Sequence, residues 1–171
     1  TGGNCDFATV ICAFSVALSS ARPVRILWTI YFSLPLNAGW NMVSFPVIPS
    51  DPSFSSIFTG VDYYQVLTWD GASYTIPTNV EAGRGYWVVV LSATTVNVTG
   101  VLVESYERDL PAGWSMIGSI YNTTVDAGTV FPAYYQMLTW DGTGYVAETT
   151  IAPGKGYWAL VLAPTHITVK K

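Results

Sequence analysis

The residues best suited to chemistry in this chain are aromatic side chains beside a short acidic turn, and they occur twice. QVLTWDGASY at 65–74 is matched by QMLTWDGTGY at 136–145. Tryptophan and tyrosine rings in such a place can stack on a sugar ring, and they can equally pack on each other across a β-hairpin. The candidate ligand-binding or adhesion aromatics are Trp69, Tyr74, Trp140 and Tyr145.

The Asp-Gly pairs inside these stretches predict hairpin turns. Asp-Gly at 70–71 and at 141–142 stands between two alternating runs, and glycine accepts the positive φ of a tight hairpin turn without steric cost. The tryptophan before each turn would then pack on the tyrosine that follows it across the hairpin. Because the turn already explains both aspartates, we do not expect them to form a catalytic carboxylate pair.

Other catalytic groups are scarce. The single histidine, His166, aligns with Thr95 when the chain's two repeats are superposed, and no serine lies in a Gly-x-Ser-x-Gly turn. Gly-x-Gly at 83–85 and at 154–156 precedes a β-like run instead of the helix that a phosphate-binding loop requires, so we expect these glycines to form a tight turn that leads Tyr-Trp into the next strand. We therefore expect a protein that is not an enzyme and that carries no cofactor.

The two cysteines do not predict a metal site. Cys5 and Cys12, with only His166 far away in the sequence, cannot supply a four-ligand shell. In an exported chain the two cysteines are candidates for a local disulfide. The alternative is two free thiols packed as small hydrophobic groups.

Composition favours a protein outside the cytoplasm. Charged residues make up 11% of the 171 residues, the net charge is −4, and the basic residues are scattered. Nucleic acid is therefore not an expected partner. The chain begins with Thr1, as after removal of a signal peptide. Sequons at Asn97 and Asn122 are candidate N-glycosylation sites, and together these features predict an extracellular or cell-surface location.

Internal repetition sets the domain organisation. Three landmarks recur: Gly-Trp at 39–40 and 113–114, Trp-Asp-Gly at 69–71 and 140–142, and Gly-x-Gly-Tyr-Trp at 83–87 and 154–158. The offset is 74 residues for the first landmark and 71 for the other two, so a loop between them has lost three residues. We expect one β-domain at 25–100 and a second at 101–171, while residues 1–24 match neither.

Each repeat has the residue pattern of an all-β domain. Val, Thr, Tyr and Trp gather in short runs bounded by Gly, Pro, Asn and Asp, with no helical period. We expect strands near 26–34, 41–47, 62–69, 73–77, 85–91 and 95–99, and their equivalents near 101–107, 114–120, 133–140, 144–148, 156–162 and 166–170. The predicted fold is all-β: two tandem duplicated small β-sandwich or barrel domains preceded by an extra N-terminal β-strand.

The unmatched N-terminal segment alternates in the manner of a strand. Its apolar face consists of Val10, Cys12, Phe14, Val16 and Leu18. The apolar run ends after about 13 residues, short of the roughly 20 that a membrane-spanning helix needs, so no membrane span is expected. Residues 7–19 either fold back on 24–34 as a hairpin or insert as a strand into a neighbouring subunit. Repeated insertion, head to tail, would build an open fibre.

The landmarks also resemble a known kind of domain. Gly39-Trp40-Asn41 and the closing motif at 83–87 resemble tandem small β-domains of secreted and cell-surface proteins of archaea and bacteria. The resemblance covers about residues 36–171. Ser115 stands where the pattern has Asn, a departure that affects only a local turn contact. A hydrophobic strand ahead of compact β-domains is similar, in organisation, to extracellular filament subunits joined by donor strands.

Two functional hypotheses follow from these features. The first is a structural subunit of a pilus-like extracellular filament or surface assembly, which polymerises by donor-strand complementation with copies of itself. The second is a carbohydrate-binding or adhesion module that uses exposed Trp and Tyr rings and has surface glycans as partners.

Overall fold

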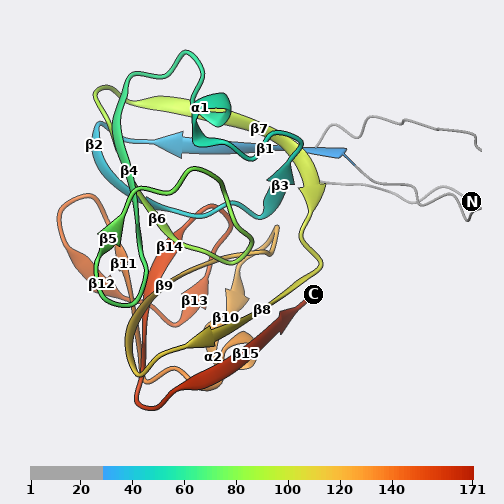
Figure 1. Cartoon of the computed structure of the whole chain (residues 1–171), viewed down its shortest axis with the longest axis vertical. Helices are drawn as coiled ribbons and strands as arrows, with labels where there is room; N and C mark the ends of the chain where they lie inside the picture. Colours follow the sequence, from blue (N-terminus) through green and yellow to red (C-terminus); the bar gives the residue numbers. More distant parts are fainter. Residues whose placement is uncertain (1–28) are drawn as a thin grey trace, which may run out of the picture.

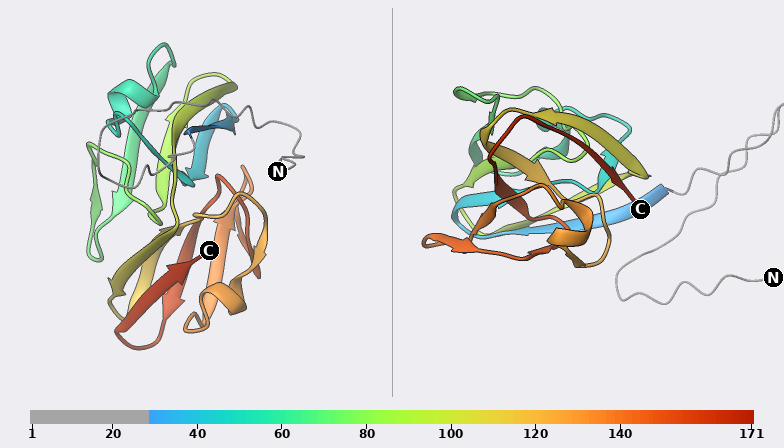
Figure 2. Two further views of the ribbon diagram at one scale, coloured as in Figure 1. Left: turned by 90° about the vertical axis from the view of Figure 1, so that its right-hand side faces the viewer. Right: turned by 90° about the horizontal axis from the view of Figure 1, so that it is seen from below.

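Each sequence repeat folds into its own pair of facing β-layers, one repeat above the other (Figure 1). The computed structural model describes residues 29–171. The left view of Figure 2 shows the same stacking from the side, with the strands of the first repeat (blue to yellow-green) above those of the second (yellow to red). The predicted all-β fold class is confirmed, and no sheet closes into a barrel.

The first repeat contains a three-stranded and a four-stranded antiparallel sheet. The smaller sheet has the order β1 (Thr29–Leu36), β7 (Thr94–Leu102), β3 (Val47–Pro49). The larger has the order β2 (Gly39–Val43), β6 (Tyr86–Val90), β4 (Tyr63–Trp69), β5 (Tyr74–Thr75). A one-turn helix, α1 (Phe54–Ile57), covers the end of the core between the two sheets.

The second repeat copies this plan. Its four-stranded sheet has the order β9 (Gly113–Gly118), β14 (Gly156–Val161), β11 (Gln136–Trp140), β12 (Tyr145–Ala147). The facing layer is the pair β8 (Ser105–Leu110) and β15 (Thr165–Lys170). A small pair, β10 (Val125–Asp126) and β13 (Thr150–Ile151), lies beside the one-turn helix α2 (Ala127–Val130).

Strand alternation builds the core of each repeat. In β6, Tyr86, Val88 and Val90 point into the first core and are buried. They meet Val96 and Val98 of β7 from the opposite sheet. Burying a valine or tyrosine side chain in this way stabilises the fold by about 1.5–3 kcal/mol. The alternate side chains of β6 point away from this core, toward the other repeat.

The structure refines several predicted elements. The run expected at 41–47 is divided between β2 and β3, which belong to different sheets. The predicted absence of helix is wrong for α1 and α2, whose first turns are capped by the side chains of Ser53 and Asp126. A single turn is too short to show a helical period. Strand β7 continues past the expected boundary at residue 100 and ends at Leu102.

The proposed N-terminal strand lies outside the described residues. Its apolar face (Val10, Cys12, Phe14, Val16 and Leu18) and the candidate disulfide between Cys5 and Cys12 therefore stay predictions. Within residues 29–171, no helix has the length and apolar character needed to cross a membrane.

Candidate functional site

The second face of each four-stranded sheet is aromatic. In β6, Trp87 lies between the two core residues Tyr86 and Val88. Its equivalent in β14 is Trp158. Strand alternation places both on the face directed away from their own core. Met42 and Met116 join them in a third hydrophobic cluster, which also includes the half-buried side chains Leu67, Trp69, Leu138 and Trp140. This cluster joins the two repeats.

The Trp-Asp-Gly stretches form the predicted hairpins. In the first repeat the Asp70 carboxylate accepts hydrogen bonds from the backbone N–H groups of Ala72 and Ser73, both at 2.8 Å. These bonds hold the pKa of Asp70 below its usual value. Gly71 has φ +108°, a conformation that favours glycine.

The second hairpin repeats this geometry. Asp141 accepts from the N–H groups of Thr143 and Gly144, at 2.8 and 2.9 Å. Across the hairpins the rings of Trp69 and Tyr74 lie 5.3 Å apart, and those of Trp140 and Tyr145 lie 5.5 Å apart, both edge to face. The predicted cross-hairpin pairs are confirmed. Such a pair contributes about 0.5–1.5 kcal/mol beyond its buried area.

The Gly-x-Gly motifs form the seam between the repeats. A Cβ on Gly85 would lie 2.6 Å from the Ile117 carbonyl oxygen, and a Cβ on Gly156 would lie 2.6 Å from the Val43 carbonyl oxygen. Only glycine permits backbones to approach so closely. Sequence analysis predicted tight turns here, and the positive φ values of Gly83 and Gly154 confirm them. The close approach to the other repeat was not predicted.

The tyrosine of each Gly-x-Gly-Tyr-Trp motif anchors the loop that carries it. The Tyr86 hydroxyl accepts from the Glu81 backbone N–H, and the Tyr157 hydroxyl accepts from the Ala152 N–H, each at 2.7 Å. Burial raises the pKa of both Tyr86 and Tyr157 to about 12. The motif therefore directs its tyrosine into its own core and its tryptophan toward the other repeat.

Reciprocal contacts relate the repeats by an approximate two-fold axis. The Ser44 N–H donates to the Gly154 carbonyl oxygen, and the equivalent Gly118 N–H donates to the Gly83 carbonyl oxygen, both at 2.9 Å. At the axis, Ser44 meets Gly118: a Cβ on Gly118 would lie 2.4 Å from that of Ser44. The Ser44 hydroxyl donates to the Lys155 carbonyl oxygen at 2.6 Å. One repeat thus contributes a side chain where the other leaves space.

Two equivalent aromatic pockets flank this axis. The first pocket has a volume of about 360 Å³ and is lined by Trp40, Leu67, Tyr74, Trp87, Trp140 and Tyr145. The second pocket has a volume of about 490 Å³ and is lined by Trp69, Tyr74, Trp114, Leu138, Tyr145 and Trp158. These volumes lie within the range of about 300–1,000 Å³ found for small-molecule sites. Each pocket takes side chains from both repeats.

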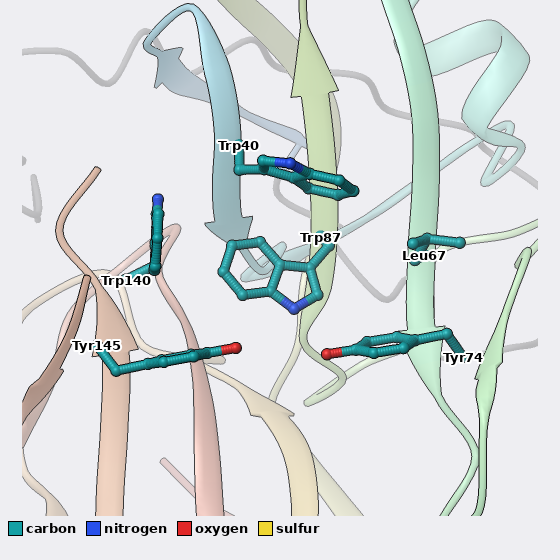
Figure 3. A pocket seen from close by; sticks show the side chains of 6 residues that line it. All are labelled: Trp40, Leu67, Tyr74, Trp87, Trp140 and Tyr145. Atoms are coloured by element: carbon teal, nitrogen blue, oxygen red, sulfur yellow. The ribbon is translucent and has the colours of Figure 1, made fainter. Parts of the chain in front are cut away.

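Each pocket has a tryptophan floor and aromatic walls. Figure 3 shows Trp87 at the back of the first pocket, with the rings of Trp40, Trp140, Tyr74 and Tyr145 arranged around it. Trp40 stands at 84° to the floor with the ring centroids 5.8 Å apart, and Trp140 stands at 75° with 5.6 Å between centroids. The floor is 6% exposed, whereas the walls Trp40 and Tyr145 are 45% and 50% exposed. The faces of the walls are therefore available to a ligand.

The second pocket has the same arrangement. Its floor, Trp158, meets Trp114 at 84° with a centroid separation of 6.5 Å and Trp69 at 70° with 5.7 Å. The Trp158 indole Nε1 donates to the Tyr145 hydroxyl at 3.3 Å. By contrast, the buried Trp140 Nε1 in the first pocket has no hydrogen-bond partner among residues 29–171. A buried donor left unpaired costs about 1–3 kcal/mol.

Two tyrosines line both pockets. The hydroxyl groups of Tyr74 and Tyr145 point toward each other between the repeats (Figure 3). Burial, and then the neighbouring Tyr145, raise the pKa of Tyr74 above its usual value. The Tyr74 phenol is thus a neutral hydrogen-bonding group at physiological pH.

Sequence analysis identified four of the eight aromatic residues that line the pockets. The structure brings Trp69, Tyr74, Trp140 and Tyr145 together in the two pockets, although they come from hairpins of different repeats. Sequence analysis did not identify the residues that form the floors and the outer walls: Trp87, Trp158, Trp40 and Trp114. A signal was present, because β6 and β14 carry large apolar residues on both faces, which is typical of a sheet covered on both sides.

The remaining candidate residues lie away from the pockets. Asn97 is exposed on β7, where its amide oxygen accepts from the Ser33 hydroxyl at 2.7 Å, and Asn122 is exposed in a loop. His166 Nδ1 lies 2.7 Å from Asp109 Oδ1 on exposed strands. Within residues 29–171 no group of three or more His, Cys, Asp or Glu side chains is placed to hold a metal ion.

Comparison of the chain with protein-family models, with curated proteins and with solved structures found no match.

Proposed function

We propose that this chain is an extracellular or cell-surface adhesion module that captures a compact organic group of its target in the two aromatic pockets. The observation that carries the proposal is the pair of equivalent pockets whose walls stay half exposed. Rings that served only to join the repeats would gain most by being fully buried, since burial contributes about 25 cal/mol per Å². Here Trp40, Trp114, Tyr74 and Tyr145 keep 36–50% of their surface exposed.

The proposed role is binding without catalysis. His166 pairs with Asp109, both residues being exposed, and no hydroxyl or thiol is hydrogen-bonded to it among the described residues. The groups that line the pockets are rings and aliphatic side chains, and no carboxylate, imidazole, amine or thiol is among the described residues that line them. A sugar ring is one ligand class that stacks on such faces, which is the form of the proposal that the sequence suggested.

Substitution of one outer wall tests the proposal. A glycan array and a fragment screen, read by the indole N–H resonances, are expected to give ligands whose binding to the first pocket is lost on Trp40→Ala and whose binding to the second is lost on Trp114→Ala. Tyr64→Ala and Tyr135→Ala are matched controls, because both tyrosines are highly exposed and lie outside the two pockets. Ligand binding that survives the Trp40→Ala, Trp114→Ala double substitution would place the site elsewhere.

As a second function, we propose a filament subunit built by N-terminal strand insertion. The supporting observation is an open sheet edge. Among residues 29–171, β1 and its equivalent β8 each pair on one side only. Strand β8 presents Glu107 and Asp109, charges that oppose pairing with another strand, whereas β1 presents uncharged Ser33 in place of Glu107. Pro35, in place of Asp109, has no N–H to donate, so the proposed acceptor edge is limited to residues 29–34. The uncharged edge of β1 is the proposed acceptor.

Truncation and an edge charge test this second function. Deletion of residues 1–20 is expected to leave folded monomers that form no fibres in negative-stain microscopy. Ser33→Lys on β1 is expected to block assembly in the same way, while Glu107→Lys on β8 leaves it intact. Fibres from the truncated chain would contradict the proposal.

A further inference from the structure

We infer that each pocket is an aromatic cage for a trimethylammonium group, that is, a nitrogen carrying three methyl groups and a permanent positive charge. This inference rests on the proposed binding function and names its ligand class. It is argued from the ring geometry, from the polar groups of the lining and from charge.

The ring geometry suits a cation. An aromatic ring carries partial negative charge on its face, so a cation within about 6 Å of a ring centroid is attracted to it. In the first pocket Trp40, Trp140 and Tyr145 stand at 84°, 75° and 73° to the Trp87 floor. Walls perpendicular to a floor direct their faces across it. A cation seated on Trp87 is therefore within reach of several ring faces at once (Figure 3).

The second pocket offers the same arrangement. Trp114, Trp69 and Tyr74 stand at 84°, 70° and 76° to the Trp158 floor. The centroid separations from floor to wall, 6.5, 5.7 and 6.2 Å, are close to those of the first pocket. The duplication has thus produced two cages rather than one cage and one packed interface.

The lining disfavours a deeply seated sugar. A sugar loses water from several hydroxyl groups on entering a pocket, and each unpaired hydroxyl is costly to bury. Among the described residues that line the pockets, the polar atoms are the phenol oxygens of Tyr74 and Tyr145 and the indole nitrogens. Trp158 Nε1 is already bonded to the Tyr145 hydroxyl. A trimethylammonium group has no N–H or O–H to satisfy, so it loses no hydrogen bond here.

Charge points in the same direction. The chain has a net charge of −4, and no lysine, arginine or histidine is among the described residues that line either pocket. Each hairpin that supplies a Trp wall continues directly into an aspartate, Asp70 or Asp141, whose pKa is lowered by backbone N–H donors. These exposed carboxylates stay ionised and add to an attractive potential for a cation.

A matched pair of ligands tests the inference with the full chain. Choline and 3,3-dimethyl-1-butanol have the same shape, but the second carries a carbon in place of the charged nitrogen. Titrations followed by calorimetry and by indole N–H shifts are expected to show two choline sites per chain. We expect choline to bind at least tenfold more tightly than its neutral isostere. Equal affinity for the two ligands would overturn the cage inference and leave the binding function standing.

Half-site variants and other ligands complete the test. Trp40→Ala is expected to leave one choline site, in the second pocket, and Trp114→Ala to leave one in the first. Binding of methyl glucosides without choline overturns the inference in favour of sugars. If no ligand of the array, the fragment screen or this set shifts the indole resonances, the binding function itself is wrong.

A vesicle experiment separates the sources of the group. Flotation with phosphatidylcholine vesicles, inhibited by free choline, would assign the cages to a lipid headgroup. Choline binding without flotation would assign them to a soluble or protein-attached trimethylammonium group. Phosphatidylglycerol vesicles serve as the control, because they present no such group, and equal flotation with both lipids would contradict headgroup recognition.

Discussion

The two repeats have equivalent aromatic residues but differ in the side chains with which each contacts the other. Both Gly-x-Gly loops lie against the partner repeat, yet Tyr106 and Arg108 meet the loop at Gly83, while the equivalent Phe32 and Leu34 meet the loop at Gly154. Arg108 donates to the Gly83 and Ala82 carbonyl oxygens, at 3.2 and 3.3 Å. Burial lowers the pKa of Arg108.

This difference shows what fusion into one chain allows. In a symmetric dimer each surface must fit a copy of itself. Here the seam is formed by two sequences that changed separately, so a guanidinium can replace an aliphatic side chain on one side only. The pockets, in contrast, kept the same lining on both sides of the axis, three Trp, two Tyr and one Leu in each. The following substitutions test how far the equivalence extends.

The floors of the pockets give the largest expected effect. Trp87→Ala and Trp158→Ala each remove a buried indole and should lower the free energy of unfolding by about 3–5 kcal/mol. Since the floors are equivalent, their costs should agree within about 1 kcal/mol in denaturant unfolding. Trp40→Ala, a half-exposed wall, should cost clearly less. Costs of the two floor substitutions that differ by clearly more than about 1 kcal/mol would show that the two-fold relation of the pockets is only geometric.

The seam glycines come next. Gly85→Ala and Gly156→Ala would drive a methyl group against a backbone carbonyl and should each cost about 1–3 kcal/mol. Gly144→Ser is the matched control, because a Cβ there meets nothing within 4 Å and the equivalent residue of the first repeat is Ser73. The control should change stability by less than about 0.5 kcal/mol. Thermal unfolding of the three variants shows whether the loss of stability comes from the seam contact or from the replacement of any glycine.

The axis pair supplies a double-mutant cycle. Gly118→Ser places two serine side chains at one point and should cost about 1–3 kcal/mol. Ser44→Gly removes the hydroxyl that accepts from the Ser119 N–H at 3.0 Å and donates to the Lys155 carbonyl, at about 1 kcal/mol. The double variant exchanges the two residues, so its cost should fall short of the sum by about 1 kcal/mol or more. Simple additivity would mean that the two positions do not meet.

The smallest expected effect is confined to the second repeat. The Asp109 hydrogen bond raises the pKa of His166 above 6.5. The contact between protonated His166 and Asp109 therefore stabilises the fold fully below pH 6.5. Its contribution is lost as the pH rises through the raised pKa. His166→Thr, which installs the residue of the first repeat, should remove this dependence from melting curves taken from about pH 5 to 8. Parallel curves for the two proteins would show that the exposed pair contributes nothing.

The sequence predicted well those features that depend on neighbours along the chain. Period-two alternation located the main strands, and Asp-Gly located both hairpins with their Trp and Tyr partners. The seam could not be predicted, because no periodicity tells which surface covers the second face of a sheet. The apolar face of β6 at Trp87 fits the other repeat, the N-terminal segment or another subunit equally well. Only the Gly-x-Gly spacing marked the place where the backbones of the two repeats meet, and a tight turn explained that spacing equally well.

Shared walls give the pockets a mechanical property. Because each pocket takes rings from both repeats, neither repeat alone contains a complete pocket. A pulling force that separates the repeats at the Gly-x-Gly seam would dismantle both sites in one step. Conversely, a ligand seated in either pocket bridges the repeats and resists their separation. In the proposed function, attachment and mechanical integrity would therefore be one property of this chain, because it would hold its target only while its two repeats hold each other.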